Sequence, residues 1–274
     1  MDQDERLDRL LRGFCEDSLD YKNLKVEKEE RRNALRALMN LRMPGPLPEK
    51  LLQLQDDFLR EEAREKGIVT PEQIPSVKEQ YGVFGRLAER ISVWQGDITR
   101  LAADAVVNAA NSGMLGCFVP CHRCIDNAIH SAAGVQLRQE CFELMEKKRK
   151  LYGADYEEPT GGAEITLAYN LPANYVIHTV GPVVHGSLSR SLEQDLRNCY
   201  QSCLKCASAH NIKSLAFCCI STGEFHFPNE RAAEIAVKTT AAYLEEHAEI
   251  EKVIFNVYKD CDLEIYQSVI EQRI

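Results

Sequence analysis

The chain has 274 residues, of which 45% are hydrophobic and 27% are charged, a composition typical of a globular protein. Its net charge of -9 at pH 7 argues against non-specific binding to nucleic acid, which attracts basic surfaces. No apolar run approaches the roughly 20 residues of a membrane-spanning helix, so we expect no membrane segment.

The cysteines and the N-terminal stretch indicate where the protein works. The stretch MDQDERLDRLLRGF is acidic and amphipathic, which is not the pattern of a secretory signal. The eleven cysteines are not spaced like a disulfide framework, and their odd number suggests free thiols. We therefore expect a cytoplasmic protein in which most cysteines are small buried side chains.

Residues 1–87 predict a helical extension. Apolar residues recur at helical spacing within residues 7–14 and 35–39, and the segment 47–67 predicts a third helix that ends at a glycine. Three prolines between residues 44 and 48 separate these helices, because proline is excluded from a helix interior. We interpret the extension as a structural cap on the main domain.

Residues 88–274 predict a layered α/β domain with a mostly parallel sheet, because short apolar runs alternate with helical patterns. A ligand of such a sheet normally binds at the carboxyl ends of the strands, so functional residues are expected just after each strand. The expected strands are ISVWQ, AVVNAA, AEITLA, NYVIHTV, KSLAFCCIS and KVIFNV, and the expected helices span residues 125–148, 189–210, 229–249 and 261–273.

Polar residues follow three of these strands. Asp97 after the first strand can accept hydrogen bonds from a nucleobase amine, although capping the next turn is the simpler interpretation. Asn108 and Asn111 end the second strand, and their amides suit either a sugar diol or a backbone turn. The small polar turn at residues 221–223 suits either a diphosphate or an ordinary loop before a helix.

The loop at residues 116–124 gathers three cysteines and a histidine. Thiolate and imidazole are the ligands that zinc prefers, and four such ligands would make a closed structural site. Three ligands, Cys117, His122 and Cys124, would leave one position open for water or substrate. In an extended loop His122 and Cys124 face the same way, whereas Cys121 points elsewhere. The alternative is three buried thiols and a hydrogen-bonded histidine, which a loop with glycine and proline disfavours.

Five motifs follow one another along the chain: GDIT at 96–99, NAAN at 108–111, DNAIHSAAG at 126–134, HTVGP at 178–182 and ISTGEFHFP at 220–228. Taken together and in order, they resemble the macrodomain family, an ADP-ribose-binding module. The resemblance covers the chain from about residue 90 to its end and implies a three-layer α/β/α macrodomain with a mixed, mostly parallel central sheet.

The sequence MLGCFVPCHRCIDNAIH departs from the glycine-rich loop GGGGVDxAIH that most macrodomains carry at this place. It is similar instead to a zinc-containing subgroup, which also has a helical N-terminal extension. That similarity implies one Zn²⁺ ion bound by Cys117, His122 and Cys124, with Cys121 at a variable position. It also implies a hydrolase that removes mono-ADP-ribose from modified proteins.

The resemblance further implies a role for each residue near the ligand. Asp126 would lie near the scissile bond, so that Asp126 and Asn111 are the candidate catalytic residues. The nucleotide would be held by the remaining residues: adenine by Asp97 and Ile98, the distal ribose by Asn108 and Asn111, and the diphosphate by Ser221, Thr222, Gly223, Glu224 and Phe225.

These expectations lead to a reaction hypothesis. Zinc beside the distal ribose could polarise the departing acyl oxygen or a ribose hydroxyl, or lower the pKa of a bound water toward about 7. Asp126 could position or deprotonate that water. The favoured substrate is an ester to an acidic side chain, and some bacterial members of the subgroup are associated with a lipoyl-carrier protein and a sirtuin-type transferase. The alternatives are a reader module that binds ADP-ribose without cleaving it and an O-acetyl-ADP-ribose deacetylase.

Overall fold

The computed structural model describes residues 1–274 and is built around one six-stranded sheet with the order β1-β6-β5-β2-β4-β3. All neighbouring strands are parallel except β3, which pairs antiparallel with β4 at one edge. This is the mixed, mostly parallel sheet that the sequence predicted. The strands are β1 (Ile91–Gln95), β2 (Ala105–Ala110), β3 (Ala163–Leu167), β4 (Tyr175–Val180), β5 (Ser214–Phe217) and β6 (Lys252–Val257).

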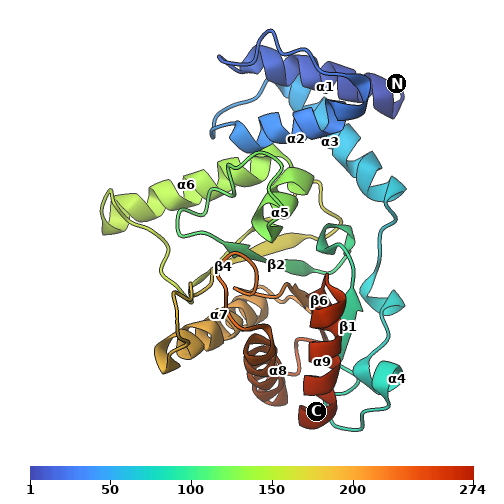
Figure 1. Ribbon diagram of the computed structural model, residues 1–274, viewed down its shortest axis with the longest axis vertical. Helices are drawn as coiled ribbons and strands as arrows, with labels where there is room; N and C mark the ends of the chain where they lie inside the picture. Colours follow the sequence, from blue (N-terminus) through green and yellow to red (C-terminus); the bar gives the residue numbers. More distant parts are fainter.

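Helices cover both faces of the sheet, which confirms the predicted three-layer α/β/α arrangement (Figure 1). Two helices lie on one face and three on the other, and 49 buried residues form the core between the layers. No helix combines the length and the apolar character that crossing a bilayer requires. The helices of the two faces are α5 (Ile125–Ala133) and α6 (Val135–Tyr152), and α7 (Arg190–Ala209), α8 (Asn229–Glu246) and α9 (Asp260–Arg273).

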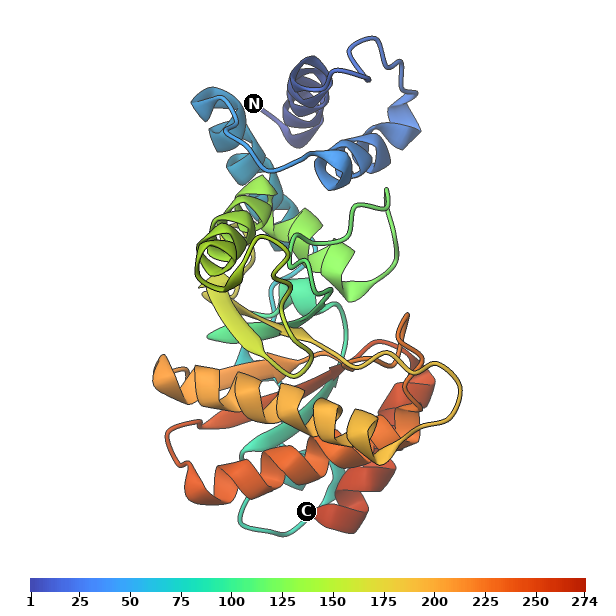
Figure 2. The same ribbon diagram turned by 90° about the vertical axis from the view of Figure 1, so that its left-hand side faces the viewer.

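The three N-terminal helices stand beyond α5 and α6, on the side away from the sheet (Figures 1 and 2). They enclose a separate core of nine buried residues. They are α1 (Gln3–Asp17), α2 (Arg31–Leu41) and α3 (Glu49–Glu65).

The chain then runs along the sheet to the short helix α4 (Val77–Tyr81). Ile74 and Val77 belong to the large core although they precede residue 87. The division of the chain into residues 1–87 and 88–274 stays a prediction.

One expected helix proves to be two. The sequence predicted a continuous helix over residues 125–148, but the chain breaks at Gly134, which has φ +95°. A side chain there would also meet Gln55 Nε2 at 2.6 Å and Asn170 Nδ2 at 2.9 Å. The expected strand KSLAFCCIS is likewise shorter, because its pairing with β6 ends at Phe217.

Candidate active site

The residues singled out after the strands come to one edge of the sheet. Asp97 and Ile98 follow β1, Asn111 follows β2, and the loop Ser221–Phe225 follows β5. Because these strands run in the same direction, their carboxyl ends lie at the same edge, where α/β sheets bind ligands.

Asp97 caps a short 3₁₀ helix (Ile98–Arg100). Its Oδ1 accepts hydrogen bonds from the backbone N–H of Thr99 at 3.0 Å and from the Thr99 hydroxyl at 2.7 Å. The Ile98 side chain is buried in the large core. The capping role is therefore present, and the Ile98 side chain is not open to a ligand.

A buried carboxyl group lies at the centre of the site. Asp126, in the first turn of α5, is 5% exposed. Its Oδ1 accepts a hydrogen bond from Asn108 Nδ2 at 2.8 Å, and its Oδ2 accepts one from Asn111 Nδ2 at 3.3 Å. Burial raises the pKa of Asp126 to about 6, although the Asn108 bond and the positive charge of Arg138 oppose the shift. The two asparagines thus hold a carboxyl group, and Asn111 is itself exposed to solvent.

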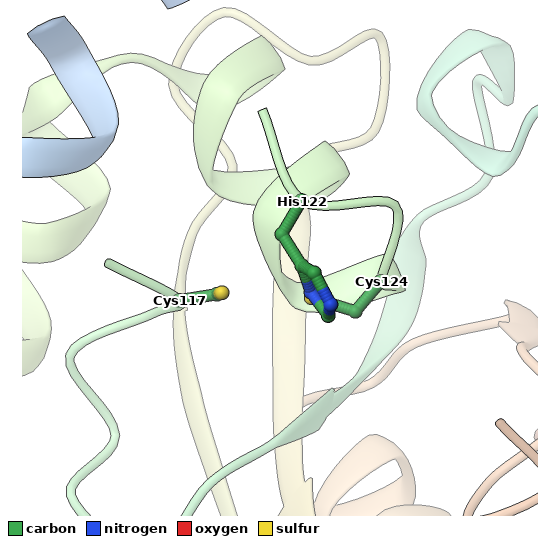
Figure 3. A group of neighbouring side chains, drawn as sticks. All are labelled: Cys117, His122 and Cys124. Carbon is green, nitrogen blue, oxygen red and sulfur yellow. The ribbon is translucent and has the colours of Figure 1, made fainter. Parts of the chain in front are cut away.

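The three predicted metal ligands come together in the loop before α5. The Sγ atoms of Cys117 and Cys124 and a ring nitrogen of His122 all lie within 4.8 Å of one another. Figure 3 shows the three side chains pointing toward one another. Cys124 is also the N-cap of α5, where its Sγ accepts a hydrogen bond from the backbone N–H of Asn127 at 3.4 Å.

Cys121 stands apart from this group. Its Sγ donates a hydrogen bond to the carbonyl oxygen of Asn33 at 3.3 Å, and its backbone is left-handed, with φ +53°. The structure therefore places Cys121 outside the three-ligand cluster. This agrees with the expectation that Cys121 points away from its neighbour His122 in an extended loop.

The cluster has the donor set that suits zinc. Two sulfur atoms and one imidazole nitrogen, spaced closely enough to share one ion, match a three-ligand site with an open position. His122 Nδ1 is buried without a hydrogen-bond partner, which is costly unless the ring binds something. Burial, with a smaller contribution from Cys117, raises the pKa of the Cys124 thiol to about 12, and a divalent cation acts in the opposite direction. These residues fit a zinc ion.

The loop Ser221–Phe225 approaches the cluster from β5. Ser221 has φ +65°, and its buried hydroxyl has no partner. Gly181 packs against it so closely that a Cβ at this glycine would lie 2.1 Å from Ser221 Oγ. Glu224 Oε1 lies 3.6 Å from His122 Nε2, so this loop and the cluster border the same space.

Sequence reasoning missed a second buried group below the carboxyl. His130, Cys141 and His178 come from α5, α6 and β4, and their ligand atoms also lie within 4.8 Å of one another. His130 Nε2 is 3.5 Å from Asp126 Oδ1. Burial lowers the pKa of both histidines, so they stay neutral. The only available signal was the four-residue spacing of Asp126 and His130, which places both on one side of a helix.

Known proteins of one family share this architecture. The Macro domain family model matches residues 107–236. A protein-ADP-ribose hydrolase of Treponema medium is 42% identical over 271 residues, covering 98% of this chain and 99% of that protein. Another from Staphylococcus aureus is 45% identical over 233 residues, covering 85% of this chain and 82% of that protein. The solved Trypanosoma brucei macrodomain in complex with ADP-ribose has a TM-score of 0.64 at 28% identity and covers 85% of this chain and 94% of that one. The predicted resemblance is confirmed at the level of the family: the chain belongs to the Macro domain family.

Proposed function

We propose that this protein is a zinc-dependent hydrolase that removes mono-ADP-ribose from modified protein side chains. Two relatives, which match 98% and 85% of this chain, are named protein-ADP-ribose hydrolases, which supports the reaction class. The observation that carries the zinc dependence is the cluster of Cys117, His122 and Cys124, which lies in the loop leading directly into the buried Asp126. We place the chain in the zinc-containing subgroup of macrodomains, whose loop the sequence at residues 116–124 resembles.

The residues around the Asp126 carboxyl group have different roles at the distal ribose. When bound, zinc supplies a Lewis acid that polarises an adjacent oxygen. Asp126, with its pKa raised to about 6, accepts a proton from the attacking water. Asn108 orients that carboxyl through its 2.8 Å hydrogen bond, and the exposed Asn111 offers its amide to the ribose hydroxyls.

The rest of the nucleotide follows the edge of the sheet. We place adenine at the turn formed by Asp97 and Ile98, and the diphosphate in the loop Ser221–Phe225. The unpartnered hydroxyl of Ser221 and the exposed backbone at Gly223 support this placement, because a diphosphate needs several donors at close range.

The acceptor we favour is an acidic side chain, since an ester has a carboxylate as its leaving group. By its similarity to the zinc-containing subgroup, we propose a lipoyl-carrier protein modified by a sirtuin-type transferase as one substrate. All eleven cysteines are free thiols, which suits a reducing compartment such as the cytoplasm.

Two cysteines of the same loop allow a matched test of this function. The substrate is a protein mono-ADP-ribosylated on glutamate, and zinc content and release of ADP-ribose are both measured. Cys117→Ala is expected to lose the metal and about 10²-fold or more of the rate, because the polarising charge is gone. Cys121→Ala removes a thiol that lies outside the cluster and is expected to keep both properties.

Three outcomes would contradict the proposal. Full activity of Cys117→Ala without zinc would refute the metal dependence. Binding of the modified protein without any cleavage would identify a reader module. Faster turnover of free O-acetyl-ADP-ribose than of the modified protein would identify a deacetylase of the small metabolite.

A further inference from the structure

The cluster loop is supported by α2 as well as by the sheet. It rises from the end of β2 toward the N-terminal helices before it enters α5 (Figure 2). Side chains of α2 bond to the backbone on both sides of His122. The geometry of the cluster therefore depends on residues about 80 to 90 positions earlier in the chain.

Arg36 makes the most direct of these contacts. Its Nη2 donates to the carbonyl oxygen of His122 at 3.1 Å, and its Nη2 and Nε both donate to Asn127 Oδ1, at 2.6 and 3.0 Å. Asn127 is fully buried, and its own donors go to the Val119 carbonyl and to Cys124 Sγ. One guanidinium thus holds the backbone of one ligand and the residue that bonds to another.

Asn40, one turn further along α2, stabilises the strained part of the loop. Its Oδ1 accepts a hydrogen bond from the backbone N–H of Cys121 at 2.9 Å, and its Nδ2 donates to Ser131 Oγ at 2.9 Å. Asn40 is 1% exposed. The left-handed conformation of Cys121 is unfavourable for a residue with a side chain, so this buried bond helps to maintain it.

Arg138 of α6 joins the end of α2 to the third ligand. Its Nη1 donates to the carbonyl oxygens of Met39 and Asn40 at 3.1 and 2.7 Å, and its Nη2 donates to the carbonyl oxygen of Cys117 at 3.3 Å. All three ligands of the cluster are therefore connected to α2 through one or two hydrogen-bonded steps.

We propose that α2 is a positioning element for the metal site and that Arg36 is its principal positioning residue. The inference rests on the zinc site of the proposed function. Residues that orient metal ligands typically change metal affinity by 10- to 100-fold when they are removed. The coupling is also reciprocal, so metal binding should stabilise the packing of the N-terminal helices by the same factor.

A matched pair of arginines on α2 tests the proposal. Zinc affinity of the full chain is measured by competition with a chromogenic chelator, for wild type, Arg36→Ala and Arg32→Ala. Arg32 lies one turn before Arg36 and pairs with Glu62 of α3 at 2.5 and 2.7 Å, without touching the loop. Arg36→Ala is expected to bind zinc about 10- to 100-fold more weakly, and Arg32→Ala to bind it as wild type does.

A spectroscopic readout separates ligand geometry from general stability. In the Co²⁺-loaded proteins, thiolate-to-metal and ligand-field bands report the coordination geometry, and we expect them to shift in Arg36→Ala but not in Arg32→Ala. Circular dichroism checks that the variants are folded. If Arg36→Ala does not fold, Arg36→Lys is used instead. It keeps the positive charge but loses the several N–H donors of the guanidinium, and the same loss of zinc affinity is expected.

Equal zinc affinity in the Arg36 and Arg32 variants would overturn the positioning role. A wild-type protein that binds no zinc would overturn both this role and the metal dependence of the proposed function. Weakened zinc binding in Arg36→Ala, together with no cleavage by wild type, would refute the proposed hydrolase and support the positioning role.

Discussion

Asn108 fixes the proton positions around the buried carboxyl. Its Nδ2, which can only donate, lies 2.8 Å from Asp126 Oδ1 and 3.1 Å from His178 Nδ1. His178 Nδ1 must therefore accept, and the proton of the neutral ring is on Nε2, 3.0 Å from Thr166 Oγ1. Protonation of His178 would place two donors face to face. The hydrogen-bond chain from Asp126 to Thr166 thus requires a neutral histidine.

This chain predicts a loss of stability in acid. Burial lowers the pKa of His178 to about 3, whereas the unfolded side chain titrates near 6.5. The unfolded state binds the extra proton, so this contribution to stability is present above pH 6.5 and is lost as the pH falls toward 3. Between pH 7 and pH 5, wild type should lose about 2 kcal/mol more of its unfolding free energy than His178→Gln does. Urea unfolding at both pH values measures this difference, and identical losses in the two proteins would contradict it.

At the scale of elements, residues distant in the sequence form hydrogen bonds to the two helix ends at the break between α5 and α6. Gln55 Oε1 of α3 accepts the hydrogen bond of the Val135 N–H at 3.1 Å, and Asn170 Nδ2 donates to the carbonyl oxygen of Ala133 at 2.9 Å. These partners satisfy the helix ends that a continuous helix would have paired internally. The α5–α6 corner is therefore also a contact point with α3.

Two glycines with similar backbones isolate the effect of that contact. Gly134 and Gly153 both have left-handed φ values, +95° and +117°, but only Gly134 has neighbours within 3 Å of the place of a Cβ. Gly153→Ala is expected to cost about 1 kcal/mol of unfolding free energy from backbone strain alone. Gly134→Ala adds a steric clash and should cost about 2–4 kcal/mol. Urea unfolding compares the two variants, and equal costs would show that the packing at Gly134 is unimportant.

Most helices and strands, and part of the candidate site, could be predicted from the sequence. Strand and helix patterns are local, so the sheet layers and the residues after each strand could be predicted from periodicity. His122 and Cys124 are separated by one residue, which likewise predicted that their side chains point the same way. The break at Gly134 was missed because its partners lie in α3 and after β3. The group of His130, Cys141 and His178 was missed because it depends on how α5, α6 and β4 pack.

At the scale of the whole molecule, the chain has two cores of very different size. The large core contains 49 buried residues, and the core of the N-terminal helices contains nine. Between them lies a mostly polar contact that includes Arg36, Asn40, Gln55 and Arg138. A small core joined to a large one by polar contacts opens more readily than the large one unfolds.

Hydrogen exchange should reveal this difference. Backbone amides of α1 are expected to exchange at least about tenfold faster than those of β2 and β4 in the same sample, because opening the N-terminal helices exposes fewer apolar residues. Mass spectrometry of peptic fragments measures both sets of amides, and fragments of equal length are compared. Exchange of α1 at the rate of β2 would mean that the two cores unfold as one unit.

All the candidate ligands and the buried carboxyl lie between Cys117 and Asp126, in a single loop and the first turn of a helix. A transplant of these ten consecutive residues would therefore carry all three ligands and the carboxyl group into another protein of the same fold. Such a transplant would also need α2, because Arg36 and Asn40 of this helix contact the transplanted stretch. A chimera that receives the loop without α2 inherits the ligands but only part of the support that orients them.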